Sequence, residues 1–412
     1  MVAVDAASHL VLVTPRHSYR TGAFLDAGRA LDCRVTVVTD ADVVIPGSAI
    51  VVDLADGDTA VAAVTEQLVP RPDAVVGTDG DALVVAAALA EQFDLPTSPS
   101  TAVAVATDKR AQREALDQAG LRQPEWALAG PDGSWPDLGG GPVVVKPVDR
   151  QAGQGVIRAD GPAAVRHATA RLRQLVGPDD PVLVERYLPG LEVAVDALVV
   201  DGDVRPLAVW DKPDTGSGPF FAETLLVQPA RLSVPERADL LGLVEAAVRA
   251  VGLTHGPVHV EARIDDEGRP WFLELAPRSI GGLCSRMVRS GGGSLEDLLI
   301  RAALGRPIAT ADDTGGPATG VYMILAPSRG SLRAVTGIDR AAASPGITAI
   351  DITVGPGVEL VPLPEGDRYV GFVFAEGDGP EEVETSLRRA AGEIDVIVSP
   401  SGRTDQSPTR GR

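Results

Sequence analysis

The first hundred residues alternate short apolar runs with segments of helical spacing, and this order limits the folds open to the chain. Runs rich in Val, Ile and Leu predict strands, whereas apolar residues three and four positions apart predict helices. The alternation consists of a strand at 9–14, a helix at 21–31, strands at 34–39 and 49–54, a helix at 60–68, a strand at 73–76 and a helix at 81–92. Because this order is typical of parallel sheets covered by helices, we expect residues 1–100 to form a small α/β domain.

The middle of the chain differs, because several predicted strands follow one another directly. A helix is expected at 101–119, where Gly120 and Pro124 end the helical pattern. The later elements are strands at 142–147, 156–159, 182–187, 192–200 and 205–211, a hairpin at 257–276, and helices at 162–175, 233–251 and 295–304. Consecutive strands favour antiparallel pairing, so residues 101–308 are expected to form an α+β domain.

The last hundred residues begin with a segment rich in Gly, Pro and Asp at 305–317, which reads as a linker. A smaller α+β domain is expected at 318–398, with a helix at 380–391. Residues 399–412 are rich in Ser, Pro, Gly and Arg and are expected to form a disordered tail.

The net charge of −20 argues against non-specific binding to nucleic acid or to anionic membranes, which needs a basic surface. The first residues show no signal-peptide pattern, and the longest apolar run, 82–90, is too short to cross a bilayer. The two cysteines and five histidines form neither a disulfide framework nor a zinc-ligand pattern. We therefore expect a cytoplasmic protein that binds neither nucleic acid nor membrane. A homodimer is compatible with the sequence.

Lysine is rare, since the chain has three lysines against thirty-four arginines. Lysine carries a compact point charge on a flexible stem and arginine a planar fork, so the two are not interchangeable where geometry is tight. The three lysines are Lys109, Lys146 and Lys212. Two explanations stand at this point: a drift toward arginine that spared three lysines by chance, or a site that needs ammonium groups.

The predicted hairpin carries acidic residues on both strands. We take residues 266–269 as a four-residue loop, so that Ile264 pairs with Trp271. Glu261 then lies directly opposite Glu274. Carboxylates whose Cβ atoms are roughly 4.5–5.5 Å apart repel each other, and Mg²⁺ bound by one or two carboxylates and substrate phosphates would relieve that repulsion. The alternative is a solvated polar face, since a slip of one residue separates the two acids.

Two further patterns are weaker. Lys146 ends a strand and precedes a turn with Gly153 and Gly155, an arrangement that can cover a polyphosphate, although ordinary turns also contain glycines and the Gly-Lys-Ser/Thr string of a P-loop is absent. A later apolar strand ends in the string Glu185-Arg186-Tyr187-Leu188, which can face a purine edge. Glu192 follows, as a candidate acceptor for ribose hydroxyls. An edge strand with solvated acids explains the same residues.

In chain order, these strings resemble the ATP-grasp superfamily and, within it, the carboxylate–amine ligases typified by bacterial L-amino acid ligases. The strings are Asp108-Lys109, Val145-Lys146-Pro147 with its glycine turn, Glu185 to Gly190 with Glu192, Gly256 to Glu261, and Glu274-Leu275-Ala276-Pro277-Arg278. Asp211-Lys212-Pro213, residues 218–224 and the segment from Gly320 are also similar to that subgroup. The resemblance extends from residue 1 to about residue 398. It implies an N-terminal parallel-sheet domain of the kind that precedes ATP-grasp domains, a central ATP-grasp domain and a small C-terminal α+β domain.

The resemblance also implies roles for individual residues, with ATP as co-substrate. Those roles are phosphate contacts for Lys109 and Lys146 beneath the 149–155 loop with Gly153 and Gly155, adenine contacts for Glu185, Arg186, Tyr187 and Leu188, and a ribose contact for Glu192. Glu261 and Glu274 would bind Mg²⁺, or Mn²⁺ in its place. Arg278 would stabilise the transferred phosphoryl group, and Lys212 would contact the γ-phosphate or the substrate carboxylate.

One position departs from the superfamily pattern, in which Glu-x-Asn often precedes the arginine and the Asn is a further metal ligand. Here that position is Ala276, which leaves the second metal to water or to Glu223. His259 and Cys284 are interpreted as structural residues.

The function implied is an ATP-dependent carboxylate–amine ligase that forms an amide or peptide bond through an acyl phosphate and releases ADP and phosphate. Its partners would be a small carboxylate, in the first place an amino acid, and an amine. Two alternatives remain: a ligase of the biotin-carboxylase or purine-pathway type on the same scaffold, and a non-catalytic ATP-binding protein.

Overall fold

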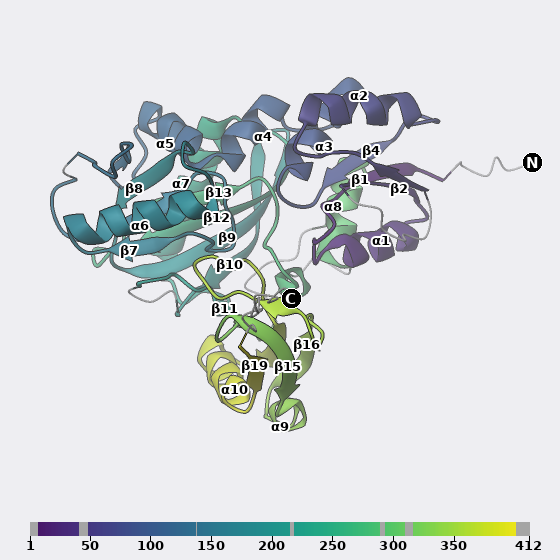
Figure 1. Cartoon of the computed structure of the whole chain (residues 1–412). Coiled ribbons are helices and arrows are strands. Elements are labelled where there is room, and N and C mark those ends of the chain that lie inside the picture. The colour runs from purple at the N-terminus through teal and green to yellow at the C-terminus, as the bar shows by residue number, and fades with distance from the viewer. Residues whose placement is uncertain are drawn as a thin grey trace, which may run out of the picture.

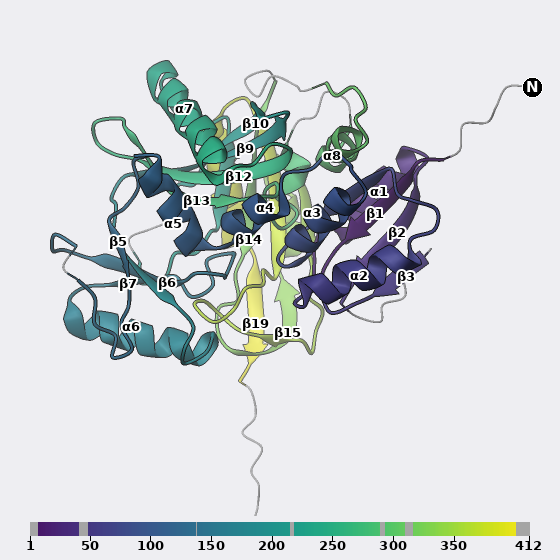
Figure 2. The same ribbon diagram turned by 90° about the horizontal axis from the view of Figure 1, so that it is seen from above.

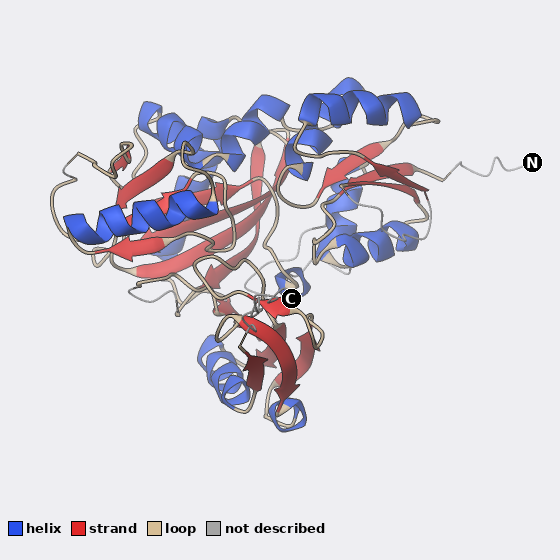
Figure 3. Ribbon diagram, in the orientation of Figure 1, coloured by secondary structure: helices blue, strands red, loops and turns tan. Residues whose placement is uncertain are grey.

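The structure is a computed structural model that describes residues 7–40, 48–136, 138–214, 218–288, 293–309 and 316–400. Figure 1 shows an N-terminal lobe, a large central lobe and a smaller C-terminal lobe, and Figure 3 shows that helices cover the sheets. Within the described ranges no helix is long and apolar enough to cross a membrane. Of the tail expected at 399–412, only Ser399 and Pro400 are described, and Ser399 ends a strand; the rest lies outside the described residues, as do residues 310–315 of the expected linker.

The N-terminal lobe is the parallel α/β domain that the alternation predicts. Its elements are β1 (His9–Val13), α1 (Thr21–Ala30), β2 (Arg34–Thr39), β3 (Ser48–Val51), α2 (Gly57–Gln67), β4 (Ala74–Gly77) and α3 (Ala82–Gln92). The strand order is β3-β2-β1-β4, and every pair is parallel. Leu10 and Leu12 pack in one core cluster, and Val11 and Val13 pack in another, because successive residues of a strand face opposite sides of a sheet. Both faces are therefore buried, which explains the uninterrupted apolar runs.

The prediction of a single helix at 101–119 is wrong. The chain forms α4 (Ser100–Thr107) and α5 (Lys109–Gln118), separated by Asp108 in an extended conformation. The Asp108 carboxylate accepts a hydrogen bond from the Ala111 N–H at 2.8 Å, which makes Asp108 the N-cap of α5. A good N-cap starts a new helix even where the apolar spacing continues. The break places Lys109 in the first turn of α5.

Residues 126–186, called the cap below, form a small antiparallel sheet covered by one helix. The sheet has the order β5-β8-β6-β7 and is covered by α6. The elements are β5 (Trp126–Leu128), β6 (Val143–Pro147), β7 (Ile157–Ala159), α6 (Pro162–Leu175) and β8 (Val182–Arg186). The strands predicted at 142–147, 156–159 and 182–187 are thus confirmed to within two residues, and so is the helix at 162–175.

An eight-stranded antiparallel sheet forms the centre of the molecule, in the order β13-β12-β9-β10-β11-β14-β18-β16. Its strands are β9 (Leu191–Val200), β10 (Asp203–Asp211), β11 (Leu225–Gln228), β12 (Gly256–Ile264), β13 (Pro270–Ala276), β14 (Ala318–Ile324), β16 (Ile347–Ile352) and β18 (Gly371–Gly377). Helix α7 (Val234–Val251), which begins in a capping box of Ser233 and Glu236 and ends at left-handed Gly252, packs against this sheet. Helix α8 (Leu295–Ala303) packs mainly against α1 and β4 of the N-terminal lobe and also contacts β12 of the central sheet (Figure 1).

The C-terminal lobe joins this central sheet through β14 and β18. Its remaining elements are β15 (Gly330–Thr336), α9 (Ile338–Ala342), β17 (Glu359–Leu360), α10 (Pro380–Gly392) and β19 (Asp395–Ser399). A second sheet has the order β17-β15-β19, and α10 packs on β14 and β18. The expected helix at 380–391 is confirmed.

The β12–β13 hairpin pairs Glu261 with Glu274, as predicted, but by a different register. Ile264 pairs with Pro270, and Arg263 pairs with Trp271, so the predicted pairing of Ile264 with Trp271 is wrong. The loop holds five residues, and a register shift beyond Ala262 restores the offset that puts the two acids opposite each other. A bulge adds one residue to a strand, and here it compensates for the longer loop.

Candidate active site

A cavity of about 780 Å³ opens where the three lobes and the cap meet. Most residues with a predicted role line it: Lys146, Gly153, Glu185, Arg186, Tyr187, Leu188, Glu192, Lys212, Glu261, Glu274 and Arg278. Lys109 and Gly155 are not part of its lining. Lys109 is nevertheless adjacent, since its Nζ lies 3.0 Å from Glu274 Oε1 and donates to the carbonyl of Arg150. The backbone N–H of Gly155 donates to the Pro364 carbonyl at 2.7 Å.

The large sheet presents the acids of the cavity in cross-strand rows. Glu274 and Glu261 form one row with Ala194 of β9, and Ala276 and His259 form the next row with Asp196. Because residues at alternate positions share a face, both rows lie on one side of the sheet.

Glu185 is held by two cations instead of facing solvent. Its carboxylate lies 2.8 Å from Lys146 Nζ and 2.7 Å from Arg113 Nε, and all three side chains are buried. Burial alone would raise the pKa of Glu185, but Arg113 and Lys146 outweigh it and lower that pKa to about 2. Burial also lowers the pKa of Lys146, which Glu185 partly offsets. Both carboxylate oxygens are thus engaged. The backbone after it is also held, since the Arg186 and Tyr187 N–H groups donate to the Glu125 and Pro142 carbonyls at 2.8 and 3.0 Å. The adenine contacts expected at 185–188 stay a prediction.

Lys212 lies among three carboxylates. Its Nζ is 2.8 Å from Glu261, 3.0 Å from Glu192 and 3.1 Å from Glu223. Burial opposes the charge of Lys212, but Glu223, Glu261 and Glu192 hold its pKa well above the ordinary value. Burial would raise the pKa of Glu261, and Lys212 and His259 together hold it well below its ordinary value. The ammonium therefore stays charged beside the opposed acids.

Arg263, to which the sequence assigned no role, connects Glu192 with Tyr187 and Leu188, residues that are predicted to contact ribose and adenine. Its Nη2 is 2.9 Å from Glu192 Oε2, and its Nη1 donates to the Leu188 carbonyl at 2.6 Å and to Tyr187 Oη at 3.0 Å. The guanidinium also lies 5.1 Å from the ring centroid of Tyr187, a cation–π distance. Glu192 and the 187–188 segment are thereby held in one arrangement.

His259 is held by a buried acid. Asp196 Oδ2 accepts from Trp210 Nε1 at 2.7 Å and contacts His259 Nδ1 at 3.3 Å, while Asp196 Oδ1 accepts from the Ile280 N–H at 2.7 Å. The Nε2 atom of His259 lies 3.6 Å from Glu261 Oε1. Burial would lower the pKa of His259, but Asp196 and Glu261 raise it to about 9. The interpretation of His259 as a structural residue misses this position beside the acid pair.

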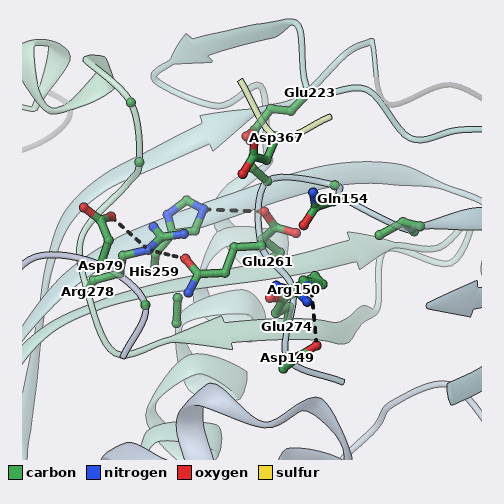
Figure 4. Close-up of a pocket in the computed structure, with 18 of the residues that line it drawn as sticks. Asp79, Asp149, Arg150, Gln154, Glu223, His259, Glu261, Glu274, Arg278 and Asp367 are labelled. Carbon is green, nitrogen blue, oxygen red and sulfur yellow. Dashed lines mark hydrogen bonds and ion pairs between the residues drawn. The ribbon is translucent and has the colours of Figure 1, made fainter. Parts of the chain in front are cut away.

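Arg278 follows β13, the strand that carries Glu274, and its side chain points into the same space as those of His259 and Glu261, as Figure 4 shows. Its Nε donates to Gln151 Oε1 of the glycine loop at 3.2 Å and lies 3.8 Å from Asp79 Oδ1 of the N-terminal lobe. Arg278 thus connects the central sheet, the cap and the N-terminal lobe. Glu223 and Asp367 reach the cavity from another side (Figure 4).

The donor set fits a metal ion that is shared with phosphates. In the described ranges, no group of three or more His, Cys, Asp or Glu side chains forms a ready metal site. The opposed pair provides two carboxylates, those of Glu261 and Glu274, and Ala276 in the next row has no side-chain atom that could bind a metal. Mg²⁺ requires only one or two carboxylates when substrate phosphates and water complete its shell. The two acids therefore suit Mg²⁺ held together with a polyphosphate.

Comparison with known proteins identifies the scaffold. The family model of the ATP-grasp domain matches residues 140–287, and that of L-amino acid ligase C-terminal domain 2 matches residues 322–399. A D-alanine–D-alanine ligase of Gloeobacter violaceus is 32% identical over 230 residues, which are 52% of this chain and 74% of that ligase. The chain belongs to the ATP-grasp family.

Other relatives match over different lengths. An uncharacterised protein of Sinorhizobium fredii is 26% identical over 321 residues, or 76% of this chain, and carnosine synthase 1 of Gallus gallus is 31% identical over 262 residues, or 57% of this chain. The chain spans 65% of the length of the first and 27% of the second. An L-amino acid ligase structure from Bacillus licheniformis superposes with a TM-score of 0.81 at 24% identity, covering 95% of this chain and 99% of that one. That likeness shows a shared three-domain ATP-grasp fold.

Proposed function

We propose that this ATP-grasp ligase joins the carboxylate of an amino acid to an amine and releases ADP and phosphate. The observation that carries the proposal is the pair of opposed acids, Glu261 and Glu274, placed between ammonium and guanidinium groups around one cavity. A D-alanine–D-alanine ligase among the relatives and an L-amino acid ligase among the structural neighbours support this class of reaction.

The reaction has two steps. The substrate carboxylate attacks the γ-phosphorus of ATP, the bond from that phosphorus to the bridging oxygen breaks, and an acyl phosphate and ADP form. The amine then attacks the acyl carbon, phosphate leaves, and the nitrogen loses a proton to give the amide. Phosphoryl transfer depends mainly on positioning and on stabilisation of charge, so no covalent enzyme nucleophile is needed.

The residues of this chain would supply that positioning and charge. Lys146 and Lys109 would contact the phosphates, and the backbone at 186–188, held by Arg263, would receive the adenine. Arg278 would stabilise the oxygens of the phosphoryl group and of the tetrahedral intermediate. Glu261 and Glu274 would hold Mg²⁺, or Mn²⁺ in its place, which neutralises phosphate charge when bound.

The substrate side of the cavity is formed mainly by the N-terminal lobe. His17, Tyr19 and Arg20 line it from the β1–α1 loop, and Asp79 and Asp81 line it after β4. Ligands of open α/β sheets bind at the carboxyl ends of the strands, where these residues lie. We assign the choice of carboxylate and amine to this wall. We also propose a cytoplasmic location for the enzyme.

The experiment is a screen for ADP and phosphate release over pairs of amino acids and small acids, with mass spectrometry of the products. One or more pairs should give an amide together with ADP. Glu274→Gln and Arg278→Ala should lose this turnover, whereas Glu267→Gln at the exposed tip of the same hairpin should keep it. Unchanged turnover in both site variants would refute the assignment of the site.

Two other results would favour the alternative functions. ATP binding without ADP release over the whole panel would indicate a non-catalytic ATP-binding protein. Bicarbonate-dependent ATP hydrolysis with added biotin would indicate a carboxylase-type enzyme.

A further inference from the structure

The loop between β17 and β18, residues 361–370, lies between the cap and the cavity, although it belongs to the C-terminal lobe. Figures 1 and 2 show this yellow-green segment beside one end of α6. Asp367 and Tyr369 of the loop line the cavity. No predicted role falls on these residues, and the chemistry described above does not use them.

Three contacts join this loop to the cap. The Gly155 N–H donates to the Pro364 carbonyl at 2.7 Å, and Gln154 Nε2 donates to the Glu365 carbonyl at 2.7 Å. Arg171 of α6 forms an ion pair with Glu365, at 2.6 Å between Nε and Oε1. The first two contacts reach the glycine loop itself, and the third holds the helix that covers the cap sheet.

The other side of the loop is anchored to the body of the molecule. The Val370 N–H donates to the Ile324 carbonyl of β14 at 2.7 Å, and the Tyr369 N–H donates to Tyr19 Oη of the N-terminal lobe at 3.3 Å. Gly366 is closely surrounded, since a Cβ there would lie 1.8 Å from the Val361 carbonyl oxygen. The loop is therefore a fixed support against which the glycine loop rests.

We propose that Glu365 and Arg171 are positioning residues that hold the glycine loop against the β17–β18 loop and so keep water from the acyl phosphate. This proposal rests on the ligase function proposed above. Neither side chain lines the cavity, so the pair acts through the position of the glycine loop. The ion pair is also half-exposed, so its loss should affect closure more than it affects the stability of the fold.

The consequence of an open loop is a defined side reaction. Water attacks the acyl phosphate, the acyl-to-phosphate linkage breaks, and the carboxylate, hydrogen phosphate and one proton are released. The carboxylate is regenerated, so ATP is consumed without amide. The ratio of amide to ADP therefore measures how well the loop excludes water.

The test uses charge reversal in the full-length chain. Glu365→Arg and Arg171→Glu are compared with the double reversal, which restores an ion pair of opposite polarity. Glu393→Arg is the matched control, because Glu393 pairs with Arg340 at 2.8 Å on the surface of the same lobe, away from the cap. Amide and ADP are quantified from the same reactions, and thermal unfolding checks that each variant is folded.

Each single reversal should lower the amide-to-ADP ratio by roughly two- to five-fold, the range expected for loss of an exposed ion pair. The double reversal should recover most of the ratio, and Glu393→Arg should leave it unchanged. Wild-type ratios in both single reversals would overturn the proposal. If the wild type makes no amide at all, the ligase function fails instead, which separates the two failures.

A second measurement needs no amide. Trypsin cleavage after Arg150, in the glycine loop, is followed by mass spectrometry with a non-hydrolysable ATP analogue bound. Both single reversals should be cleaved faster than the wild type, and the double reversal and Glu393→Arg should match the wild type. Equal cleavage in all variants would overturn the proposal that Glu365 and Arg171 hold the glycine loop in place.

Discussion

Two buried arginines, Arg113 and Arg263, hold Glu185 and Glu192, the acids predicted to face a bound nucleotide. The sequence gives little indication of either, because thirty-four arginines offer no contrast. Arg113 lies four residues after Lys109, so the two share a helix face, which is the one signal that points to it. The rare lysines drew attention because each stands next to a recognisable string. Lys146 and Lys212 line the cavity and Lys109 contacts Glu274, while their roles toward phosphates stay predictions. Residues that act by holding others, such as Asp196, carry no such string and become visible only when the strands pair.

Arg113→Met should destabilise the protein by about 3–5 kcal/mol, because it leaves part of the buried charge of Glu185 without a partner. Arg113 also donates to the Leu273 carbonyl at 2.6 Å, and that acceptor would be left open as well. Urea denaturation measures the difference. The control is Arg110→Met on the same helix, where the pair with Glu114 is exposed and contributes less than about 1 kcal/mol. Equal losses of unfolding free energy in the two variants would contradict the view that Arg113 stabilises the buried carboxylate of Glu185.

The pairing of Glu185 with Arg113 and Lys146 also predicts that stability depends on pH. The pKa of Glu185 is lowered from 4.5 to about 2 in the folded protein, so its stabilisation is fully present above pH 4.5 and is lost as the pH falls toward 2. The difference in free energy of unfolding between the wild type and Glu185→Gln should therefore narrow over that interval. Denaturant titrations from pH 6 to pH 3 would show it. A difference that stays constant with pH would count against the charged state of Glu185.

At the scale of elements, periodicity predicts most helices and strands to within a few residues, and it fails where one residue interrupts a pattern. The apolar spacing of 101–119 continues through Asp108, so only the capping preference of Asp indicates two helices. The pairing of the acids was predicted from a loop length that is wrong by one residue, and the bulge compensates for it. The sequence contains no signal for this bulge. The pairing of Glu261 with Glu274 was therefore predicted correctly, but the register of the residues nearer the loop was not.

Asp108→Ala should cost about 1 kcal/mol of stability, because α5 loses its N-cap. It should also weaken ATP binding, because Lys109 is the first residue of that helix. Ser294→Ala serves as the control, since Ser294 caps α8 by accepting from the Asp297 N–H at 3.0 Å and neither it nor its sequence neighbours line the cavity. The control should lose a similar free energy of unfolding and keep its affinity for ATP, as measured by calorimetry. Unchanged ATP affinity in Asp108→Ala would show that the N-cap of α5 is not needed to place Lys109 for ATP binding.

At the scale of the whole molecule, the central sheet crosses the expected boundary between the second and third domains. Strands β14 and β18 continue a sheet that begins with β13 in the ATP-grasp domain. The sequence predicts a separate third domain because a linker precedes it, and pairing between β11 and β14 is a long-range contact that local patterns do not encode. The C-terminal lobe also supplies Asp367 and Tyr369 to the cavity. The lobe is thus part of the site.

A chain ended after residue 309 should fail to fold into a stable monomer, because it would expose the β11 edge and the apolar faces that β14 and α10 cover. Circular dichroism and size-exclusion chromatography would detect the loss. A well-folded, monomeric truncated chain would show that the third domain is dispensable for the fold.

The acyl phosphate is the central claim, and isotope transfer tests it most directly. The wild-type enzyme is supplied with ATP, an amine and the amino acid that it accepts, labelled with ¹⁸O in both carboxylate oxygens. Attack of the carboxylate on the γ-phosphorus leaves one labelled oxygen bound to phosphorus. Mass spectrometry of the released phosphate should therefore show one ¹⁸O atom for each amide formed. Amide formation with unlabelled phosphate would contradict an acyl phosphate intermediate.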